Sequence, residues 1–568
     1  MTQVEAISQQ RIPDGRFGNC DSPDAARTKV LLCSVFGPYA RDDDYGSRSI
    51  NPMELYHNQV TRVQGPFSLR MFHRSWGLML IRENLDVPCT LLDFPSLDRF
   101  IAEIKHRSYD VIGISAIIPN VEKVEKMCRL IRQFQPSATI VVGGHVASIP
   151  DLKRRIDADH VVRGEGVRWF REFLGLDPRA ALKHPLIHSA VGTRCMGIPL
   201  STTGKDAAAV LIPSVGCPMG CNFCCTSAMF GGKGKFVNFF QSGDELFDIM
   251  SRIQKEMKVQ SFFVMDENFL LQKTRAMRLL ELMQKFSKPW SLYLFSSANI
   301  LRAYSIEELV GLGVSWVWMG LEGRNSRYPK LQGTDTFALV KTLQSHGICV
   351  LGSSIIGLEE HSPRNIDQVI EDAVEYDADF HQFMLYTPFP GTPLGAEHAA
   401  SGTLLDAKEC SEADTHGQLR FNFRHPHITD GRESQYLLDA FQRDFDVNGP
   451  SVLRVARTRL NGWLRYKNHP DRRIRDRYRR ECRTLATTFA GALWAARRWC
   501  SDNPPLVARM TDLLDRIRRE FGLVSRALSP VYGAYILRAL RAEDARLRAG
   551  WTYEPPTFYE KNRWAENG

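Results

Sequence analysis

The chain has 568 residues, 43% of them hydrophobic and 24% charged, which is ordinary for soluble globular protein and long enough for several domains. No apolar run approaches the ~18 residues needed to span a bilayer, the N-terminus shows no basic and apolar secretory pattern, and the 13 cysteines are too sparse for a disulfide scaffold. A cytoplasmic, reducing location is therefore expected. The net charge of +9 lies in residues 401–568, with 30 Lys and Arg against 21 Asp and Glu, while the first 400 residues are neutral.

Residues 1–28 are polar and predict a flexible N-terminal extension. A strand–helix alternation follows, with strands expected at 29–35, 89–93, 110–115, 139–144 and 160–162 and helices at 72–84, 96–105 and 121–134. Short apolar strands between amphipathic helices predict a doubly wound, Rossmann-like α/β domain over 29–175. Ligands of such sheets bind beyond the carboxyl ends of the strands. Residues 176–206, rich in Pro, Gly and polar residues, predict a linker.

A second α/β domain is expected over 207–400. Its strands are predicted at 209–213, 261–265, 290–295, 315–319, 349–356 and 380–386, and its helices at 242–255, 274–285, 305–312, 337–346 and 364–376. Six strands alternating with helices suit a partial β/α barrel, whose reactive face lies at the carboxyl ends of the strands.

Three cysteines, Cys217, Cys221 and Cys224, follow the first of these strands in one loop. Closely spaced thiolates favour an iron–sulfur cluster or zinc. A structural zinc site needs a fourth ligand nearby, but Cys225 is directly adjacent and the next histidine downstream is His346. Three cysteines in one loop therefore favour a [4Fe–4S] cluster with one open iron.

The pattern C-x3-C-x-aromatic-C, with Phe223 before the last cysteine, resembles that of the radical S-adenosylmethionine (SAM) enzymes. Upstream, Ser115-Ala-Ile117 and Gly143-Gly144 end two strands and resemble the cobalamin-binding domain. The alternative is a generic doubly wound domain with small strand-end turns. Together the two patterns resemble the cobalamin-dependent (B12-binding) radical SAM family, which implies a Rossmann-like domain, a partial (β/α)6 barrel and a helical C-terminal domain.

The resemblance implies three cofactors and their contacts. Cys217, Cys221 and Cys224 would hold the [4Fe–4S] cluster, and Ser115, Ile117, Gly143 and Gly144 would contact cobalamin. SAM would be contacted by Asp266, Asn268, Ser297, Glu322, Ile355 and Gly357, with Ser297 where relatives carry an arginine. Acidic residues at strand ends are more often solvated or capping. Tyr386 is expected either to face the substrate as a catalytic proton donor or to pack at the barrel mouth.

One motif of other cobalamin proteins is missing. The loop after the first strand, residues 36–46, contains no histidine and so lacks the D-x-H-x-x-G motif that supplies a lower cobalt ligand. The lower ligand is then water, a backbone group or nothing.

Residues 401–568 predict a helical, basic C-terminal domain. Residues 451–480 hold 11 Lys and Arg against two Asp, which suits an anionic lipid leaflet, a phosphorylated substrate or nucleic acid, or arginines paired with acids elsewhere. No nucleic-acid-binding signature is present, and no nucleic acid partner is expected. Apolar residues at helical spacing indicate core or a pocket for an apolar substrate: Leu485, Phe489, Leu493 and Trp494.

The function that the resemblance implies is C-methylation of an unactivated carbon in a small molecule or lipid through a 5′-deoxyadenosyl radical. Two alternatives stay open: a cyclisation or rearrangement without methyl transfer, and a non-catalytic corrinoid-binding protein with a structural metal site. The expected partners are the small-molecule or lipid substrate, a low-potential electron donor such as flavodoxin or ferredoxin, and an acidic membrane surface.

Overall fold

The computed structural model describes residues 27–37, 45, 60–204, 207–321 and 335–566. Its first sheet has the strand order β17-β3-β1-β4-β5-β6, with β1 (Val30–Ser34), β3 (Cys89–Asp93), β4 (Val111–Ser115), β5 (Thr139–Gly143) and β6 (His160–Val161) parallel. These strands are buried and apolar because helices cover them: α2 (Trp76–Glu83), α3 (Leu97–His106), α4 (Val121–Phe134) and α6 (Gly166–Phe173). The predicted doubly wound α/β fold is confirmed.

The sixth strand of this sheet comes from the far end of the chain. β17 (Phe558–Lys561) pairs antiparallel with β3 and covers an edge that would otherwise expose unpaired backbone groups. Glu560 forms ion pairs with Arg74 and Arg82, and Arg74 lies 4.3 Å from the ring centre of Phe558. Residues 401–568 were expected to be helical throughout, so this strand is a difference. It arises because a four-residue edge strand takes its stability from its partner, which local sequence does not reveal.

The second sheet has the order β16-β15-β14-β13-β12-β9, and all its pairs are parallel. Its strands are β9 (Ala208–Leu211), β12 (Ser261–Val264), β13 (Ser291–Phe295), β14 (Val314–Gly320), β15 (Cys349–Ile356) and β16 (Phe380–Leu385). Its outer face packs on helices α8 (Gly243–Met257), α9 (Lys273–Lys285), α11 (Ile306–Gly311), α12 (Thr336–Ser345) and α13 (Ile366–Val374). This is the predicted partial (β/α)6 barrel.

Short antiparallel strands form two further small sheets. β2 (Arg70–Phe72), β7 (Val191–Cys195) and β8 (Ile198–Pro199) form a three-stranded sheet, although 72–84 was expected as one helix and 176–206 as a linker. β10 (Ser214–Val215) pairs with β11 (Val237–Asn238) on either side of the cysteine loop.

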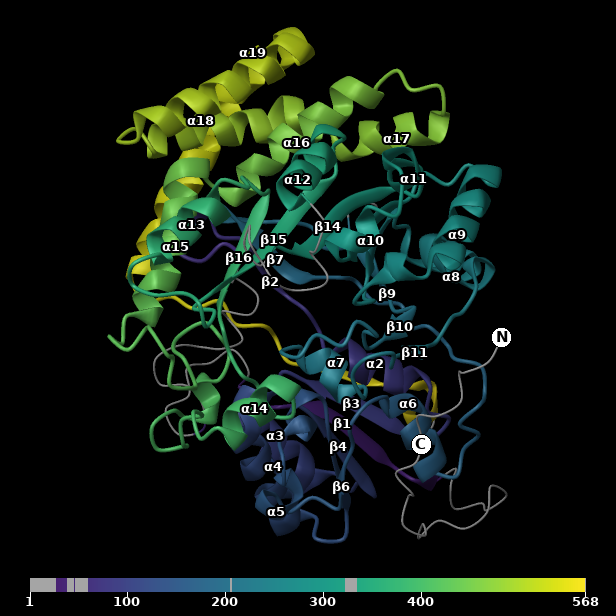
Figure 1. Cartoon of the computed structure of the whole chain (residues 1–568). Coiled ribbons are helices and arrows are strands. Elements are labelled where there is room, and N and C mark those ends of the chain that lie inside the picture. The colour runs from purple at the N-terminus through teal and green to yellow at the C-terminus, as the bar shows by residue number, and fades with distance from the viewer. Residues whose placement is uncertain (1–26, 38–44, 46–59, 205–206, 322–334, 567–568) are drawn as a thin grey trace.

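The chain ends in long helices, namely α15 (Glu433–Asn448), α16 (Ser451–Tyr466), α17 (Arg472–Glu481), α18 (Ala490–Trp499) and α19 (Pro504–Arg548). In Figure 1 α16, α17, α18 and the labelled part of α19 lie at the opposite end of the molecule from β1, β4, α3 and α4, with the barrel between, whereas α15 lies beside α13 and β16. Among the described helices, none has the length and apolar character needed to cross a membrane. The predicted domain boundaries, at residues 28/29, 175/176, 206/207 and 400/401, stay predictions.

The arginines of residues 451–480 mostly hold this helical part to the barrel. Buried Arg454 and Arg459 pair with Asp444, at 2.7 Å, and with Glu481 of neighbouring helices. Both also donate to the barrel, Arg454 Nη1 to Ala378 O at 3.1 Å and Arg459 Nη1 to Ser315 Oγ at 2.8 Å. Arg477 donates to Val310 O at 2.9 Å, at the end of α11. Of the alternatives left open above, pairing within the fold accounts for these three side chains. Leu485 and Leu493 are core residues, and Phe489 and Trp494 pack against the same core.

Candidate active site

The cysteine loop is held in one shape by its own backbone. Gly234 N donates to Pro218 O at 2.8 Å, and Ser227 Oγ donates to Cys217 O at 2.9 Å. Gly220 has a φ of +69°, and a Cβ there would lie 2.6 Å from Lys233 Cβ, so only glycine lets the two halves of the loop meet. The glycine-rich run 231–234 thus serves as a local turn. The short helix α7 (Cys225–Met229) begins at Cys224.

The three predicted cluster ligands are half-buried and lie within electrostatic reach of one another. Burial raises the pKa of the Cys217 thiol to about 11, and the nearby Cys224, Glu267 and Cys221 add to that rise. The Cys225 side chain instead packs into the core of the first domain, where burial raises its pKa to about 12. Among the described residues no three His, Cys, Asp or Glu side chains gather as a site for a single metal ion. The donor set is three thiols in one loop, which fits an iron–sulfur cluster.

The ends of β4 and β5 form a cradle in the first domain. Ser115 lies beside Gly143 in register, and Ile117 follows at the start of a short 3₁₀ helix, η3 (Ile118–Asn120). Gly144 has φ +83° and ψ −169°, and a Cβ there would lie 2.6 Å from Ala116 O. At Gly143 the nearest atom to an added Cβ is 3.8 Å away, so the protein itself leaves that space open. A side chain would fill the cradle, which fits a bulky ligand tail approaching the backbone.

This cradle faces the cysteine loop. The 3₁₀ turn η4 (His145–Ser148), directly after Gly144, lies against α7, with His145 Nε2 3.3 Å from Thr226 Oγ1. The loop after β16 closes the contact, because a Cβ on Gly391 would lie 2.3 Å from Ser148 O, and Leu394 N donates to Asn222 O at 3.1 Å. The two predicted cofactor sites, about 75 to 100 residues apart in sequence, therefore meet across one short interface.

Asp266, predicted to contact SAM, is already engaged by the protein. Its Oδ2 accepts hydrogen bonds from Ser214 Oγ at 2.6 Å and from Arg275 Nη2 at 2.7 Å, and its Oδ1 accepts from Asn268 N at 3.0 Å. Asp266 and Arg275 are both buried, so the pair ties β10, β12 and α9 together. Its part in SAM binding stays a prediction, and these contacts favour a structural role.

The next residue, Glu267, was not singled out from the sequence. Its Oε2 is buried and has no hydrogen-bond partner within the described part of the chain. Burial raises the pKa of this carboxyl to about 7, and the neighbouring Asp266 adds to the rise. The charge of Glu267 acts on both Cys217 and Cys224, which places it beside the cysteine loop. The run Asp-Glu-Asn after a strand was the available signal, but it does not say which carboxylate faces the site.

Two other predicted residues meet at the ends of β12 and β13. Asn268 Nδ2 donates to Ser297 Oγ at 3.2 Å, and Ser297 Oγ donates to Asn299 Oδ1 at 2.7 Å. Ser296 Oγ also donates to Asn268 Oδ1 at 3.1 Å. The structure thus joins Asn268 and Ser297 in one uncharged network.

The remaining predicted positions lie on the other side of the barrel. Ile355 is half-buried on β15, and Gly357 follows with φ +80° and its N–H donating to His361 Nδ1 at 3.0 Å. Tyr386 is buried in a hydrophobic cluster, edge-on to Phe423 at 5.9 Å, which favours packing, while its catalytic role stays a prediction. Glu322 lies outside the described residues, as does most of the 36–46 loop.

On the described strands, the inner face of the barrel is lined by aromatic rings and carries no charged side chain. Inward-facing residues alternate with those packed on the helices, and they are Phe263, Tyr293, Phe295, Trp316, Trp318, Leu351, Ser353, Ile355, Gln382 and Met384. Phe295 stacks on Trp318 at 5.1 Å and meets Phe263 edge-on at 5.7 Å. The polar groups satisfy one another, since Trp318 Nε1 donates to Ser353 Oγ and Ser353 Oγ donates to Gln382 Oε1, both at 2.8 Å.

Comparison with known proteins identifies both halves of this arrangement. Residues 78–174 match the family model for the B12 binding domain, and residues 211–373 match that for the radical SAM superfamily. The chain therefore carries the two domains of the cobalamin-dependent radical SAM enzymes. The predicted family is thereby confirmed, and the cofactors are a [4Fe–4S] cluster, SAM and cobalamin. A non-catalytic corrinoid-binding protein is excluded.

Relatives of this radical SAM enzyme include proteins named methyltransferases and one named a cyclase, the anaerobic magnesium-protoporphyrin IX monomethyl ester cyclase of Rubrivivax gelatinosus. An uncharacterized methyltransferase of Pyrococcus horikoshii is 26% identical over 57% of this chain and 77% of its own length. The bacteriochlorophyllide d C-12(1)-methyltransferase of Chlorobaculum tepidum is 30% identical over an aligned segment that covers 33% of this chain and 42% of that protein. The radical SAM methyltransferase TsrM of Kitasatospora setae, solved with cobalamin and a [4Fe–4S] cluster, aligns with a TM-score of 0.48 at 16% identity over 81% of this chain and 99% of its own.

Proposed function

We propose that this enzyme is a C-methyltransferase that acts on an unactivated carbon. The observation that carries the proposal is the direct contact between the Gly143–Gly144 cradle and the cysteine loop through η4 and α7. When bound, the cluster with SAM supplies a 5′-deoxyadenosyl radical, and cobalamin supplies a methyl group. A substrate held at this interface would lie between the source of the radical and the source of the methyl group.

The chain's own residues bind and orient these groups. Cys217, Cys221 and Cys224 would ligate the cluster. Glu267 would accept a hydrogen bond from the SAM ammonium group, because a buried carboxylate is stabilised by an opposite charge. Its buried Oε2 lacks a partner among the described residues. Asn268 and Ser297 offer uncharged hydrogen-bonding groups for the SAM carboxylate at the neighbouring strand ends.

The substrate we propose is bulky and apolar. Among the described residues, the inner wall of the barrel holds five aromatic rings in mutual contact or register, no charged side chain, and polar groups that are occupied by one another. Burial of an apolar substrate against such rings is favourable at about 25 cal/mol per Å², whereas a charged substrate would lose its hydration without a partner.

The proposal also includes an electron donor, a cellular location and a membrane contact. A low-potential electron donor such as flavodoxin or ferredoxin would reduce the cluster, and a cytoplasmic location would keep it reduced. Contact with an acidic membrane surface, expected from residues 451–480, is not supported by their buried arginines, and another surface is considered in the following subsection.

The experiment uses anaerobically reconstituted enzyme, SAM carrying a trideuterated methyl group, and apolar extracts of cells that lack the protein. We expect an extract component to gain the labelled methyl group while 5′-deoxyadenosine is released. Cys221→Ser is expected to abolish both, whereas the matched Cys225→Ser variant retains both, because Cys225 points into the first domain's core. Release of 5′-deoxyadenosine with a changed but unlabelled product would refute methylation and support a cyclisation or rearrangement.

A further inference from the structure

Helix α19 carries an exposed apolar face in its second half. Leu523 is 82% exposed, Val531 65% and Tyr535 61%, and Val524 and Tyr532 are also exposed. Leu523, Ala527, Val531 and Tyr535 recur every four residues, so they line one side of the helix. This face, 523–535, is about 18 Å long at 1.5 Å per residue. The opposite side, which includes Ser525, Ser529 and Ile536, is buried against the protein.

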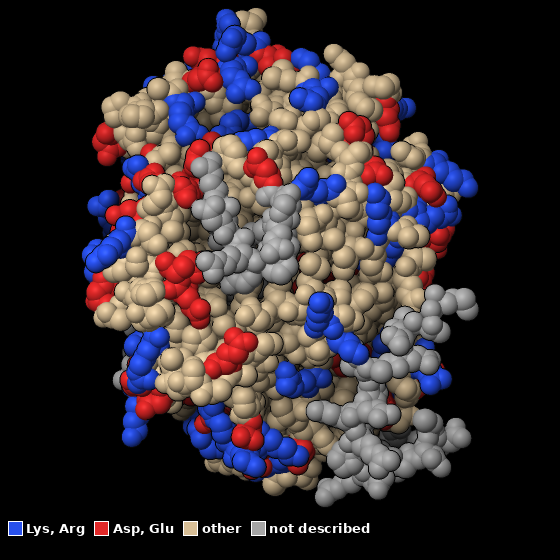
Figure 2. Space-filling model, in the orientation of Figure 1, with Lys and Arg blue, Asp and Glu red and all other residues tan. Residues whose placement is uncertain are grey.

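Within residues 521–542, which contain face 523–535, every Asp, Glu, Lys or Arg is an arginine. No Asp or Glu occurs between Glu520 and Glu543, whereas Arg526, Arg538 and Arg541 lie in that interval and are exposed. Arg518 and Arg519 precede it. In Figure 2 Lys and Arg side chains project from this upper end of the molecule, where Figure 1 places α19.

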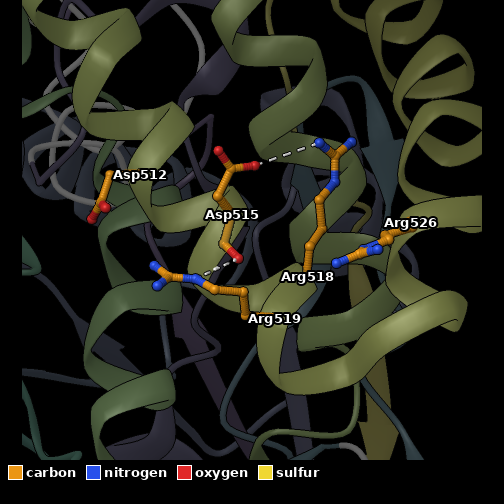
Figure 3. A pocket seen from close by; sticks show the side chains of 5 residues that line it. All are labelled: Asp512, Asp515, Arg518, Arg519 and Arg526. Atoms are coloured by element: carbon orange, nitrogen blue, oxygen red, sulfur yellow. Dashed lines mark hydrogen bonds and ion pairs between the residues drawn. The ribbon is translucent and has the colours of Figure 1, made fainter.

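A kink in α19 opens a hollow beside this face. Gly522 interrupts the helix with φ 60° and ψ −137°, and an open hollow of about 710 Å³ is lined by Asp512, Asp515, Arg518, Arg519 and Arg526. Asp515 engages two of the arginines, through its carboxylate with Arg518 at 3.7 Å and through its carbonyl with Arg519 Nε at 3.4 Å (Figure 3). Arg526 extends toward Arg518 in the same view. Within the described chain Arg526 has neither a hydrogen bond nor an ion pair.

We propose that face 523–535 and the hollow at Gly522 dock the enzyme on an anionic phospholipid surface. The apolar side chains would enter the boundary between headgroups and acyl chains, as amphipathic helices do, and the guanidinium groups would meet lipid phosphates. The absence of acidic residues from 521 to 542 is what an anionic leaflet requires. A second copy of the chain fits less well, because it would bring Arg518, Arg519, Arg526, Arg538 and Arg541 of each copy together with only Asp512 and Asp515 of the hollow between them.

The proposal goes beyond the methyl transfer and does not depend on it. The helix would lie on the bilayer, which agrees with the finding that none of the described helices qualifies to cross one.

The test is flotation of the full-length, reconstituted enzyme with vesicles of phosphatidylcholine alone or containing phosphatidylglycerol. We expect binding to the phosphatidylglycerol vesicles only, weakening as salt is raised. The variant Leu523→Asp/Val531→Asp is expected to bind at least about tenfold more weakly, and Arg526→Gln about fivefold more weakly, as loss of one surface cation implies.

Two matched variants serve as controls. Phe286→Asp changes another exposed apolar residue, on the barrel, and Arg129→Gln changes an exposed arginine of the first domain, and both are expected to bind like the wild type. The unfolding temperature of every variant is measured, and those of the α19 variants and Arg129→Gln should match the wild type, since their changed side chains are exposed. Equal binding to both vesicle types, or binding unaffected by Leu523→Asp/Val531→Asp, would overturn the proposal. So would a wild-type dimer that this variant dissociates without vesicle binding. Release of 5′-deoxyadenosine, measured separately, tests the proposed function alone.

Discussion

Gly143 and Gly144 allow the cobalamin cradle to be tested by two neighbouring substitutions with opposite consequences. At Gly144 the φ of +83° and ψ of −169° cost a residue with a side chain about 1–3 kcal/mol. The added Cβ would also lie 2.6 Å from Ala116 O and 2.9 Å from Ser115 Oγ. Gly144→Ala is therefore expected to destabilise the first domain by about 3 kcal/mol, which lowers its melting temperature by about 6 °C or more.

At Gly143 the same change meets no atom closer than 3.8 Å, so stability should stay within about 1 kcal/mol of the wild type. Its methyl group would nevertheless intrude on the space left for cobalamin. An overpacked contact costs about 1–3 kcal/mol, so Gly143→Ala should weaken cobalamin binding by about tenfold or more.

The assays are thermal unfolding of the cobalamin-free protein and titration of cobalamin followed by its visible absorbance. Gly143→Ala with wild-type affinity for cobalamin would refute the cradle. Gly144→Ala with wild-type stability would refute the packing argument for the strand ends.

Three further predictions concern the barrel, the histidines and the C-terminal strand. Asp266→Ala should destabilise the protein by about 3 kcal/mol in urea unfolding, because it leaves buried Arg275 without its ion-pair partner. Glu267→Gln should leave urea unfolding unchanged and weaken SAM binding measured by calorimetry. Equal effects of the two substitutions would contradict a structural role for Asp266 and a SAM-binding role for Glu267. Burial lowers the pKa of His184 and His381 to about 4, so the unfolded chain takes up these protons first as pH falls. The free energy of unfolding should therefore be highest above pH ~6.5 and fall toward pH 4, by about 3 kcal/mol for each histidine. Urea titrations at stepped pH measure this fall, and a free energy of unfolding that stays constant between pH 6.5 and 4 would rule it out. Glu560→Gln weakens the ion pairs with Arg74 and Arg82 that hold β17 on β3. Amide hydrogen exchange in β3 should therefore become faster relative to that in β5. Unchanged exchange in β3 would show that these ion pairs do not hold β17.

Much of the fold was predictable because its patterns are local. Buried parallel strands are apolar runs, and amphipathic helices show their period within one element, so eleven of the twelve strands of the two main sheets were expected near their observed positions. The twelfth, β17, was missed because its partner lies some 470 residues away. The sheet of β2, β7 and β8 was missed for the same reason, since short antiparallel strands depend on their neighbours.

The basic run 451–480 shows where composition misleads. Its charge left open a surface for anions or arginines paired with acids elsewhere, and the second holds for the buried Arg454 and Arg459. The exposed basic surface with apolar character lies further on, in α19. Which arginine is paired depends on carboxylates such as Asp444 and Glu481 brought close by helix packing, and a charge count contains no such information.

By itself the sequence indicated the chemistry. The spacing of Cys217, Cys221 and Cys224 favours an iron–sulfur cluster, because ligand type is a property of residues in one segment. SAM and cobalamin followed from the resemblance of this motif and of the two strand ends to a known family. Only the tertiary structure decided which groups are available to those cofactors. It occupies Asp266 with Arg275 and leaves Glu267 Oε2 unpaired among the described residues, and it brings the Gly143–Gly144 cradle against the cysteine loop. Availability depends on hydrogen-bond partners from distant segments, and those are chosen by packing.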